Sequence, residues 1–255
     1  ITLPLAHGKT LDYRNRSRHG DIRYLWELNR HLELVTLAQA FRLTGEFRYA
    51  AACRVLVESW IAQCPYPKGP NWVSALEHGV RLTNWSVAWH LLGGGHSRLF
   101  DGKDGADFKL RWLGAVYRHC AFVAGHFSLH SSANNHLLGE YAGLFSATLT
   151  WPCWPESRRW REVAQAGLVR EADKQNAGDG VNREQAVWYH HEVADMMLLA
   201  GLFGRANGHE MPSTFWQRLE AMLGFIAALM DSGGHVPALG DADDAVLVRF
   251  SPAPD

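Results

Sequence analysis

Apolar residues recur at helical spacing along most of the chain. Leu25, Leu28 and Leu32, for instance, follow one another at intervals of three and four residues, which places them on one face of a helix. Glycine and proline residues such as Gly45 and Pro65 interrupt the pattern, as they do where helices end. The pattern predicts eight long helices, over residues 21–43, 46–63, 72–92, 107–125, 134–151, 156–177, 183–203 and 212–231.

The segments between the predicted helices are short, so consecutive helices should lie antiparallel as hairpins. The expected fold class is therefore all-α. From Gly233 onward the chain becomes rich in Gly, Pro and Asp, and residues 246–250 are a strand-like run. Because a single strand is not stable by itself, we expect residues 1–232 to form the helical domain. Residues 233–255 should be a linker and the first strand of a β module that is cut off here.

The composition is that of a soluble globular protein, with 47% apolar and 20% charged residues among 255. A formal net charge of -1 gives no overall field that would attract nucleic acid or an acidic polymer, so an acidic ligand needs a local cluster of donors. No apolar run reaches the length of a membrane span. The chain also holds 11 Trp and 14 His, more than a core requires. A Trp ring in a cleft can lie flat on a sugar ring, although we expect most of them in the core.

The first predicted helix places polar side chains beside a tryptophan. Glu27, Arg30 and His31 fall on one helical face next to Trp26, at positions i, i+3 and i+4. Side chains of this kind would suit the wall of a polar cleft with an aromatic platform. An ordinary surface ion pair would give the same pattern.

The third predicted helix repeats this combination. Glu77 and Arg81 form an i, i+4 pair shortly after Asn71 and Trp72. With the first helix, these residues look like a lined cleft for carbohydrate. The competing interpretation, a core tryptophan beside a surface ion pair, has equal weight.

Residues 131–136, Ser-Ser-Ala-Asn-Asn-His, lie where the fifth predicted helix begins. The unpaired backbone N–H groups and the positive end of the helix dipole favour an anion at this point. Asn134, Asn135 and His136 add side-chain donors, and Glu140 lies one turn further on. The segment therefore has what a sugar carboxylate requires, although an Asn cap beside a solvated His would look the same.

Residues 184–191 combine Glu184 with Tyr189, His190 and His191 on a predicted helix. A buried core tyrosine is the default interpretation of any single Tyr. His191 and Asp195 imitate a helical zinc-protease motif, but no spacing indicates a third ligand.

These segments together resemble the heparinase II/III family of polysaccharide lyases. The matching stretches are Trp-Glu-Leu-Asn-Arg-His at 26–31, Asn-Trp at 71–72, Leu-Glu at 76–77, Arg-Leu-Thr-Asn-Trp at 81–85, Asn-Asn-His-Leu at 134–137, and Glu-Gln at 184–185 with Tyr-His at 189–190. Ala186 departs from the family motif, which usually has Ser there. Residues 237–244 are similar to the join to the family's second domain. The ordered set covers nearly the whole chain.

The resemblance implies an incomplete helical toroid followed by an antiparallel β-sandwich, with an acidic polysaccharide cleaved between the two. It implies that Asn135, helped by His136, neutralises the uronate carboxylate and that Tyr189 is the catalytic tyrosine. It also implies a His from the β-sandwich, which is absent here, so the chain alone should bind weakly and turn substrate over slowly or not at all. No cofactor is implied for this part, although a metal in the β module would fit. A periplasmic or secreted bacterial protein is implied, and no signal segment precedes Ile1.

The chemistry of β-elimination explains these roles. The C5 proton of a uronic acid becomes removable once donors such as Asn135 and His136 spread the carboxylate charge. A tyrosine can act as base and acid if a nearby cation lowers its pKa from about 10. His190, His191, Arg81 and Arg183 are the candidates for this cation.

We therefore predict one concave face that carries both groups of residues. The predicted catalytic residues are Tyr189, Asn135, His136 and His190, and the predicted substrate-binding residues are Trp26, Glu27, Arg30, Asn71, Trp72, Glu77, Arg81, Asn134, Glu140 and Glu184. Two alternatives stay open. One is an acidic-carbohydrate-binding domain without catalysis, and the other is a glycoside hydrolase that uses two carboxylates among Glu77, Glu140 and Glu184.

Overall fold

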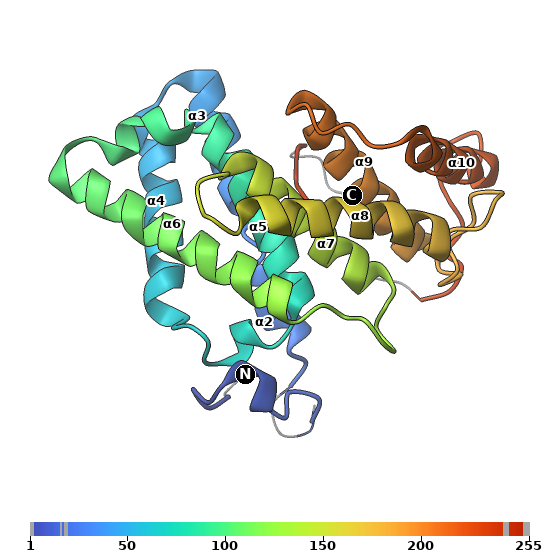
Figure 1. Ribbon diagram of the computed structural model, residues 1–255, viewed down its shortest axis with the longest axis horizontal. Coiled ribbons are helices and arrows are strands. Elements are labelled where there is room, and N and C mark those ends of the chain that lie inside the picture. The colour runs from blue at the N-terminus through green and yellow to red at the C-terminus, as the bar shows by residue number, and fades with distance from the viewer. Residues whose placement is uncertain (1–2, 16, 18–19, 242–244, 252–255) are drawn as a thin grey trace. The chain divides into compact units, whose positions relative to one another are not determined.

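The computed structural model describes residues 3–15, 17, 20–241 and 245–251, and its regular structure is helical. The long helices are α2 (Arg23–Leu28), α3 (Leu32–Thr44), α4 (Phe47–Gln63), α5 (Ala75–Leu91), α6 (Gly102–Gly125), α7 (Asn135–Thr150), α8 (Ser157–Gln175), α9 (Val187–Ala206) and α10 (Ser213–Leu229) (Figure 1). Short 3-10 helices are η1 (Gly8–Thr10), η2 (Pro70–Trp72), η3 (Gly94–His96) and η4 (Arg98–Phe100). No β-strand occurs within these described ranges, as the all-α prediction requires.

The chain divides into two compact units, which are described separately. The first unit comprises Ile1–Gly125 with Val248–Asp255, and the second comprises His126–Leu247. In the first unit, α3 packs against α4 and α5, and α6 packs against α4 and α5. Its core is strongly aromatic: Trp60, Trp72, Trp85, Trp89 and Trp112 are buried there.

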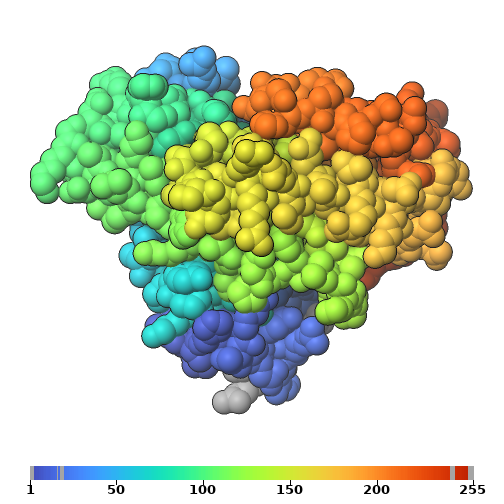
Figure 2. All heavy atoms as spheres, in the orientation of Figure 1, coloured from blue at the N-terminus to red at the C-terminus, as the bar shows by residue number. Residues whose placement is uncertain are grey.

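In the second unit, α7 is the central helix, and α8 and α9 pack against it. Most residues of α7 are buried, whereas α8 is polar on its outer side and lies at the surface in the view of Figure 2 (yellow). The close approach of α8 depends on Gly167, because a Cβ there would meet the Tyr141 ring at 2.5 Å. The helix α10 covers parts of α8 and α9.

The predicted helix over residues 21–43 is wrong in one respect, because it is two helices. The helix α2 ends at Leu28, and His31 has the left-handed backbone conformation, with φ of 62°. Tertiary hydrogen bonds replace those of a continuous helix. Arg81 Nε donates to the Asn29 carbonyl at 2.6 Å, and Trp85 Nε1 donates to His31 Nδ1 at 2.8 Å. Glu27, Arg30 and His31 therefore do not share a helical face.

Other helix boundaries differ from prediction in smaller ways. The helix α9 begins at Val187 rather than at residue 183, because Gln185 has a φ of 57° and breaks the helical path. The helix α6 begins earlier than predicted, at Gly102. Residues 246–250 do not form a strand, since the part of the chain that the structure describes offers no second strand for them to pair with. Residues 242–244, part of the stretch that resembles the family's domain join, lie outside the described residues, as do 252–255 of the predicted β module.

None of the helices in the described part of the chain is long and apolar enough to cross a membrane.

Candidate functional site

The start of α7 binds the carboxylate of Glu184 in this structure, whereas the sequence predicts a substrate carboxylate at this point. The backbone N–H of Asn135 donates to Glu184 Oε1 at 2.9 Å, and Asn134 Nδ2 donates to Oε2 at 3.0 Å. The Asn135 side chain also donates to this carboxylate, with Nδ2 at 2.9 Å from Oε2 and 3.2 Å from Oε1. Asn134 caps the helix by accepting from the His136 N–H. An internal carboxylate thus completes the cap of α7.

The geometry of the Asn135 amide limits how it can bind Glu184. The two hydrogens of a planar amide nitrogen diverge widely, so they cannot both point at the two oxygens of one carboxylate. One N–H of Asn135 is therefore shared between Oε1 and Oε2, and the second N–H points away from Glu184. Glu184 fixes the plane of the amide in this way and sets the direction of its second N–H.

Asn182 holds the loop that carries Glu184. Its Oδ1 accepts from the Glu184 N–H at 3.0 Å, and its Nδ2 donates to Asn176 Oδ1 at 2.9 Å. Both asparagines are buried. Asn182 is not among the predicted site residues. Its signal in the sequence is an Asn shortly after a glycine turn and two residues before Glu184, a position typical of a side chain that bonds to its own backbone.

His190 holds the same loop. It is 2% exposed, its Nδ1 accepts from the Asn182 N–H at 3.3 Å, and its Nε2 donates to the Met222 carbonyl at 3.0 Å. These bonds require the neutral ring with hydrogen on Nε2. Burial lowers the pKa of His190, as does the nearby His191, while the Met222 carbonyl opposes the shift. In this structure His190 is a neutral, buried ring that holds the loop, and its catalytic role stays a prediction.

Tyr189 lies in the first turn of α9 and is half-buried. The bonds from Glu184 to Asn135 bring the start of α9, only three residues after Glu184, next to the start of α7. The tail of the chain covers this point: the Val187 N–H donates to the Leu239 carbonyl at 3.0 Å. Asn135 and Tyr189 thus belong to the same end of two helices that pack together.

Glu140 is a structural residue rather than the predicted substrate ligand. Its side chain is 0% exposed and accepts from the Ser128 N–H at 2.8 Å and from the Ser128 hydroxyl at 2.6 Å. These bonds tie the segment before α7 to the helix itself. A sugar could reach this carboxylate only if the segment were displaced.

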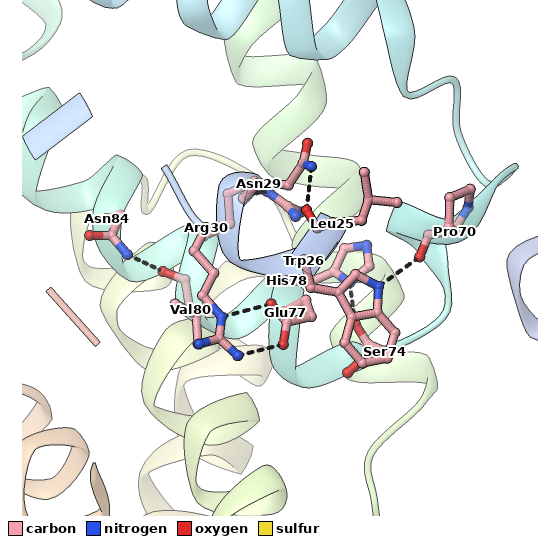
Figure 3. A network of polar contacts seen from close by, with 11 residues as sticks. Leu25, Trp26, Asn29, Arg30, Pro70, Ser74, Glu77, His78, Val80 and Asn84 are labelled. Carbon is pink, nitrogen blue, oxygen red and sulfur yellow. Dashed lines mark hydrogen bonds and ion pairs between the residues drawn. The ribbon is translucent and has the colours of Figure 1, made fainter. Parts of the chain in front are cut away.

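In the first unit, Glu77 pairs with Arg30 and not with Arg81 as predicted. Arg30 Nε and Nη2 donate to the two Glu77 carboxylate oxygens, both at 2.9 Å (Figure 3). Glu77 is 2% exposed, so this is a buried, two-pronged ion pair. Glu27, the nearer partner in sequence, is exposed. Arg30 encloses the Glu77 carboxylate in this structure, and the substrate-binding role of Glu77 stays a prediction.

Arg81 is fully buried and turns away from Glu77. It donates to the Asn29 carbonyl, and its Nη1 lies 3.0 Å from His119 Nε2. Burial lowers the pKa of Arg81 to about 10, with Glu77 opposing the shift, so the guanidinium is charged at neutral pH. Burial also lowers the pKa of His31 to about 3 and that of His119 well below its usual range. Arg81 is thus the charged member of a neutral histidine cluster.

Trp72 lies in the core and is not available as the predicted sugar platform. It is 1% exposed, its ring is 4.5 Å from that of His78 and 4.9 Å from that of His119, and its Nε1 donates to the Cys64 carbonyl. Trp26 is half-buried and donates to the Pro70 carbonyl at 3.0 Å (Figure 3). Two of the predicted aromatic positions therefore stabilise the fold of the first unit.

The predicted site residues fall into two groups. The second unit holds Asn134, Asn135, His136, Glu140, Glu184, Tyr189 and His190, and the first holds Trp26, Glu27, Arg30, Asn71, Trp72, Glu77 and Arg81. Within each unit the structure brings most of its group together. That both groups line one concave face stays a prediction. Across the described ranges, no three His, Cys, Asp or Glu side chains come together as metal ligands, so His191 and Asp195 find no third ligand there.

Comparison with solved structures shows the fold class first. A crystal structure titled heparinase III matches with a TM-score of 0.68 and 19% identity over 80% of this chain and 30% of that one. Heparan sulfate lyase HepC from Pedobacter heparinus matches with a TM-score of 0.66 and 20% identity over 91% of this chain and 36% of that one. The predicted fold class is confirmed.

The family follows from the sequence. Residues 4–249 match the family model of the heparinase II/III N-terminus, and the chain belongs to this family. A heparin-sulfate lyase from Bacteroides stercoris is 24% identical over 261 residues, which cover 92% of this chain and 37% of that protein. A heparin-sulfate lyase from Bacteroides thetaiotaomicron is 24% identical over 77% of this chain and 28% of its own length. The chain thus spans about a third of the relatives it matches.

Proposed function

We propose that this chain is the helical part of a polysaccharide lyase that cleaves a uronic-acid-containing polysaccharide by β-elimination. Family membership supports the enzyme class. The observation that carries the mechanism is that Glu184 links the start of α7, with Asn135, to the start of α9, with Tyr189. A carboxylate-binding amide and a tyrosine on adjacent helix ends are two of the groups that this elimination needs.

In this mechanism, the second N–H of Asn135 donates to the uronate carboxylate, and His136 contributes alongside it. Donors aimed at the carboxylate stabilise the negative charge that builds up when the C5 proton leaves. Tyr189 takes the C5 proton and donates a proton to the oxygen on C4. The bond between C4 and this oxygen breaks as the C4–C5 double bond forms. Glu184 does not touch the substrate; it is a positioning residue for the Asn135 amide.

The relatives named heparin-sulfate lyase favour a glycosaminoglycan as the substrate. A bacterial enzyme that cleaves such an extracellular polymer would act in the periplasm or outside the cell. The residues that complete the site would come from a β-sandwich domain after this chain, in keeping with the longer relatives. The two-carboxylate hydrolase is disfavoured, because Glu77 and Glu140 are both enclosed by their partners.

An absorbance assay tests the proposal. Elimination creates a double bond conjugated with the carboxylate, so a lyase produces ultraviolet absorbance and a hydrolase produces reducing ends without it. The assay uses heparan sulfate, alginate and a neutral polysaccharide, with this chain and with a version extended through the next domain. We expect absorbance from a uronate polymer, faster with the extended version. Reducing ends without absorbance would identify a hydrolase, and binding without either would leave a carbohydrate-binding domain.

Glu184→Gln tests the positioning role. Glutamine offers one acceptor oxygen where the carboxylate offers two, and its own NH2 group faces the Asn134 and Asn135 donors. The Asn135 amide then loses its fixed plane, and misplacement of about 1 Å costs up to about 100-fold in rate. We expect kcat to fall by that amount with little change in KM, measured by the same absorbance.

The control for this variant is Asp179→Asn, which removes one negative charge from an exposed position of the same loop. It should leave kcat unchanged. If both variants behave alike, the effect is electrostatic and Glu184 has no positioning role. If Glu184→Gln raises KM alone, Glu184 contacts substrate directly.

A further inference from the structure

The first unit contains a pocket of about 690 Å³, and none of its lining residues belongs to α7. It lies beside the junction of α2 and α3, and α4 and η2 complete its wall. Leu25, Leu56 and Trp60 give it an apolar surface, while Asn29, His31 and Asn71 give it polar groups. Its volume is within the range of small-molecule sites, which hold a few polar groups in a mainly apolar wall.

His31 presents a hydrogen-bond donor at this pocket. Its Nδ1 accepts from Trp85 Nε1 and therefore carries no hydrogen. The ring is neutral because it is buried, so its hydrogen is on Nε2. Among the residues that the structure describes, Nε2 has no hydrogen-bond partner, and His31 lines the pocket. The hydrogen bond from Trp85 holds the ring in this orientation.

Asn71 is a second polar side chain in the pocket wall with an unused group. It is 7% exposed, and its Nδ2 lies 3.1 Å from Cys64 Sγ. Its Oδ1 is buried and has no hydrogen-bond partner within the described part of the chain. Buried polar atoms are nearly always paired, so an orphan on a pocket wall indicates a missing partner such as a ligand or water.

Arg81 places a positive charge behind the same wall. Its Nε is bonded to the Asn29 carbonyl, and its guanidinium lies 4.4 Å from the centre of the Trp60 ring. Its Nη2 is buried without a hydrogen-bond partner in the described ranges, and Glu77, the nearby anion, is already paired with Arg30. Because few polar groups surround the Arg81 guanidinium, its charge is weakly screened and acts on an anion in the pocket.

The geometry points to this pocket as a second carbohydrate site, which takes one acidic sugar unit with its carboxylate or sulfate toward His31 and Arg81. The C–H face of the sugar ring can lie on Leu25, Leu28 and Leu56, which line the pocket. The identity of the ligand as a sugar rests on the proposed function, whereas the preference for an anion rests on the unpaired donors and the charge of Arg81.

Exposed positions allow a test that leaves the core intact. Ser59 is exposed on α4 and lines the pocket, so Ser59→Trp fills the pocket from its rim. Ala62 is exposed on the same helix and does not line the pocket, so Ala62→Trp is the matched control. We measure binding of a heparan sulfate tetrasaccharide to the 255-residue chain by titration calorimetry. The dissociation constant should rise at least tenfold for Ser59→Trp and stay unchanged for Ala62→Trp.

Modified ligands identify the anionic group. A carboxyl-reduced and a desulfated tetrasaccharide should lose affinity to different extents, and the larger loss identifies the removed group, carboxylate or sulfate, as the one that meets His31. Equal binding of a tetrasaccharide that lacks both groups would overturn the assignment of an anion. Absence of binding to the wild-type chain, or equal loss in both tryptophan variants, would overturn the site itself.

These outcomes are distinguishable from failure of the proposed function. A protein that produces unsaturated sugars while Ser59→Trp binds like Ala62→Trp is a lyase without this second site. A protein that produces none, yet binds the tetrasaccharide less tightly after Ser59→Trp only, has the second site without the proposed reaction.

Discussion

Tyr189→Phe is expected to lower kcat of the lyase reaction by about 10²- to 10⁴-fold, the contribution of one positioned acid–base group. The substitution removes a single oxygen from the first turn of α9 and keeps the ring. In the proposed mechanism Asn135 and its neighbours bind the substrate, so KM should change little. The measurement is the initial rate of ultraviolet absorbance on the best polymer from the panel, with the chain extended through the next domain.

Tyr141→Phe is the control for this variant. It makes the same change in the same unit, where the Tyr141 hydroxyl accepts from Arg170 and has no role in the proposed reaction. Its kcat should stay close to that of the wild type, and both proteins should show the same helical circular dichroism. A wild-type rate for Tyr189→Phe would mean that another group moves the proton and that the start of α9 only shapes the site.

Glu77→Gln is expected to lower the free energy of unfolding by about 3–5 kcal/mol, as loss of one partner of a buried ion pair does. Arg30 would then face an amide in a site where Glu77 is 2% exposed. Arg81, whose charge Glu77 also stabilises, would lose its nearest anion. Two arginines would lie in the interior with their compensating charge removed. Urea unfolding at neutral pH measures the loss.

Arg30→Gln should cost less than Glu77→Gln, because the Glu77 carboxylate would still have the charge of Arg81 nearby. The external control is Glu162→Gln, which breaks the exposed pair of Glu162 with Arg158 and should have little effect. If the Glu77 and Arg30 variants lose the same stability, Arg81 is compensated elsewhere and the argument for its uncompensated charge is wrong.

The sequence by itself determined the helices and several of their ends, because these depend on interactions between near neighbours. Periodic apolar residues predicted α4 and α8 closely. Gly45 ends α3 in the left-handed conformation that glycine adopts readily, and Asn134 caps α7. The anion at the start of α7 was predictable for the same reason, since a helix end leaves its N–H groups unpaired wherever the chain leads.

The tertiary structure alone decided which side chain meets which. Spacing suggested Arg81 as the partner of Glu77, but Arg30, 47 residues away, lies closer and meets both carboxylate oxygens. Arg81 instead bonds to the backbone at Asn29 and thereby contributes to the break between α2 and α3. The anion at α7 is Glu184, brought across by a loop that Asn182 holds. A sequence pattern reports neighbours along the helix, whereas hydrogen bonds and ion pairs depend on distances between helices that only packing sets.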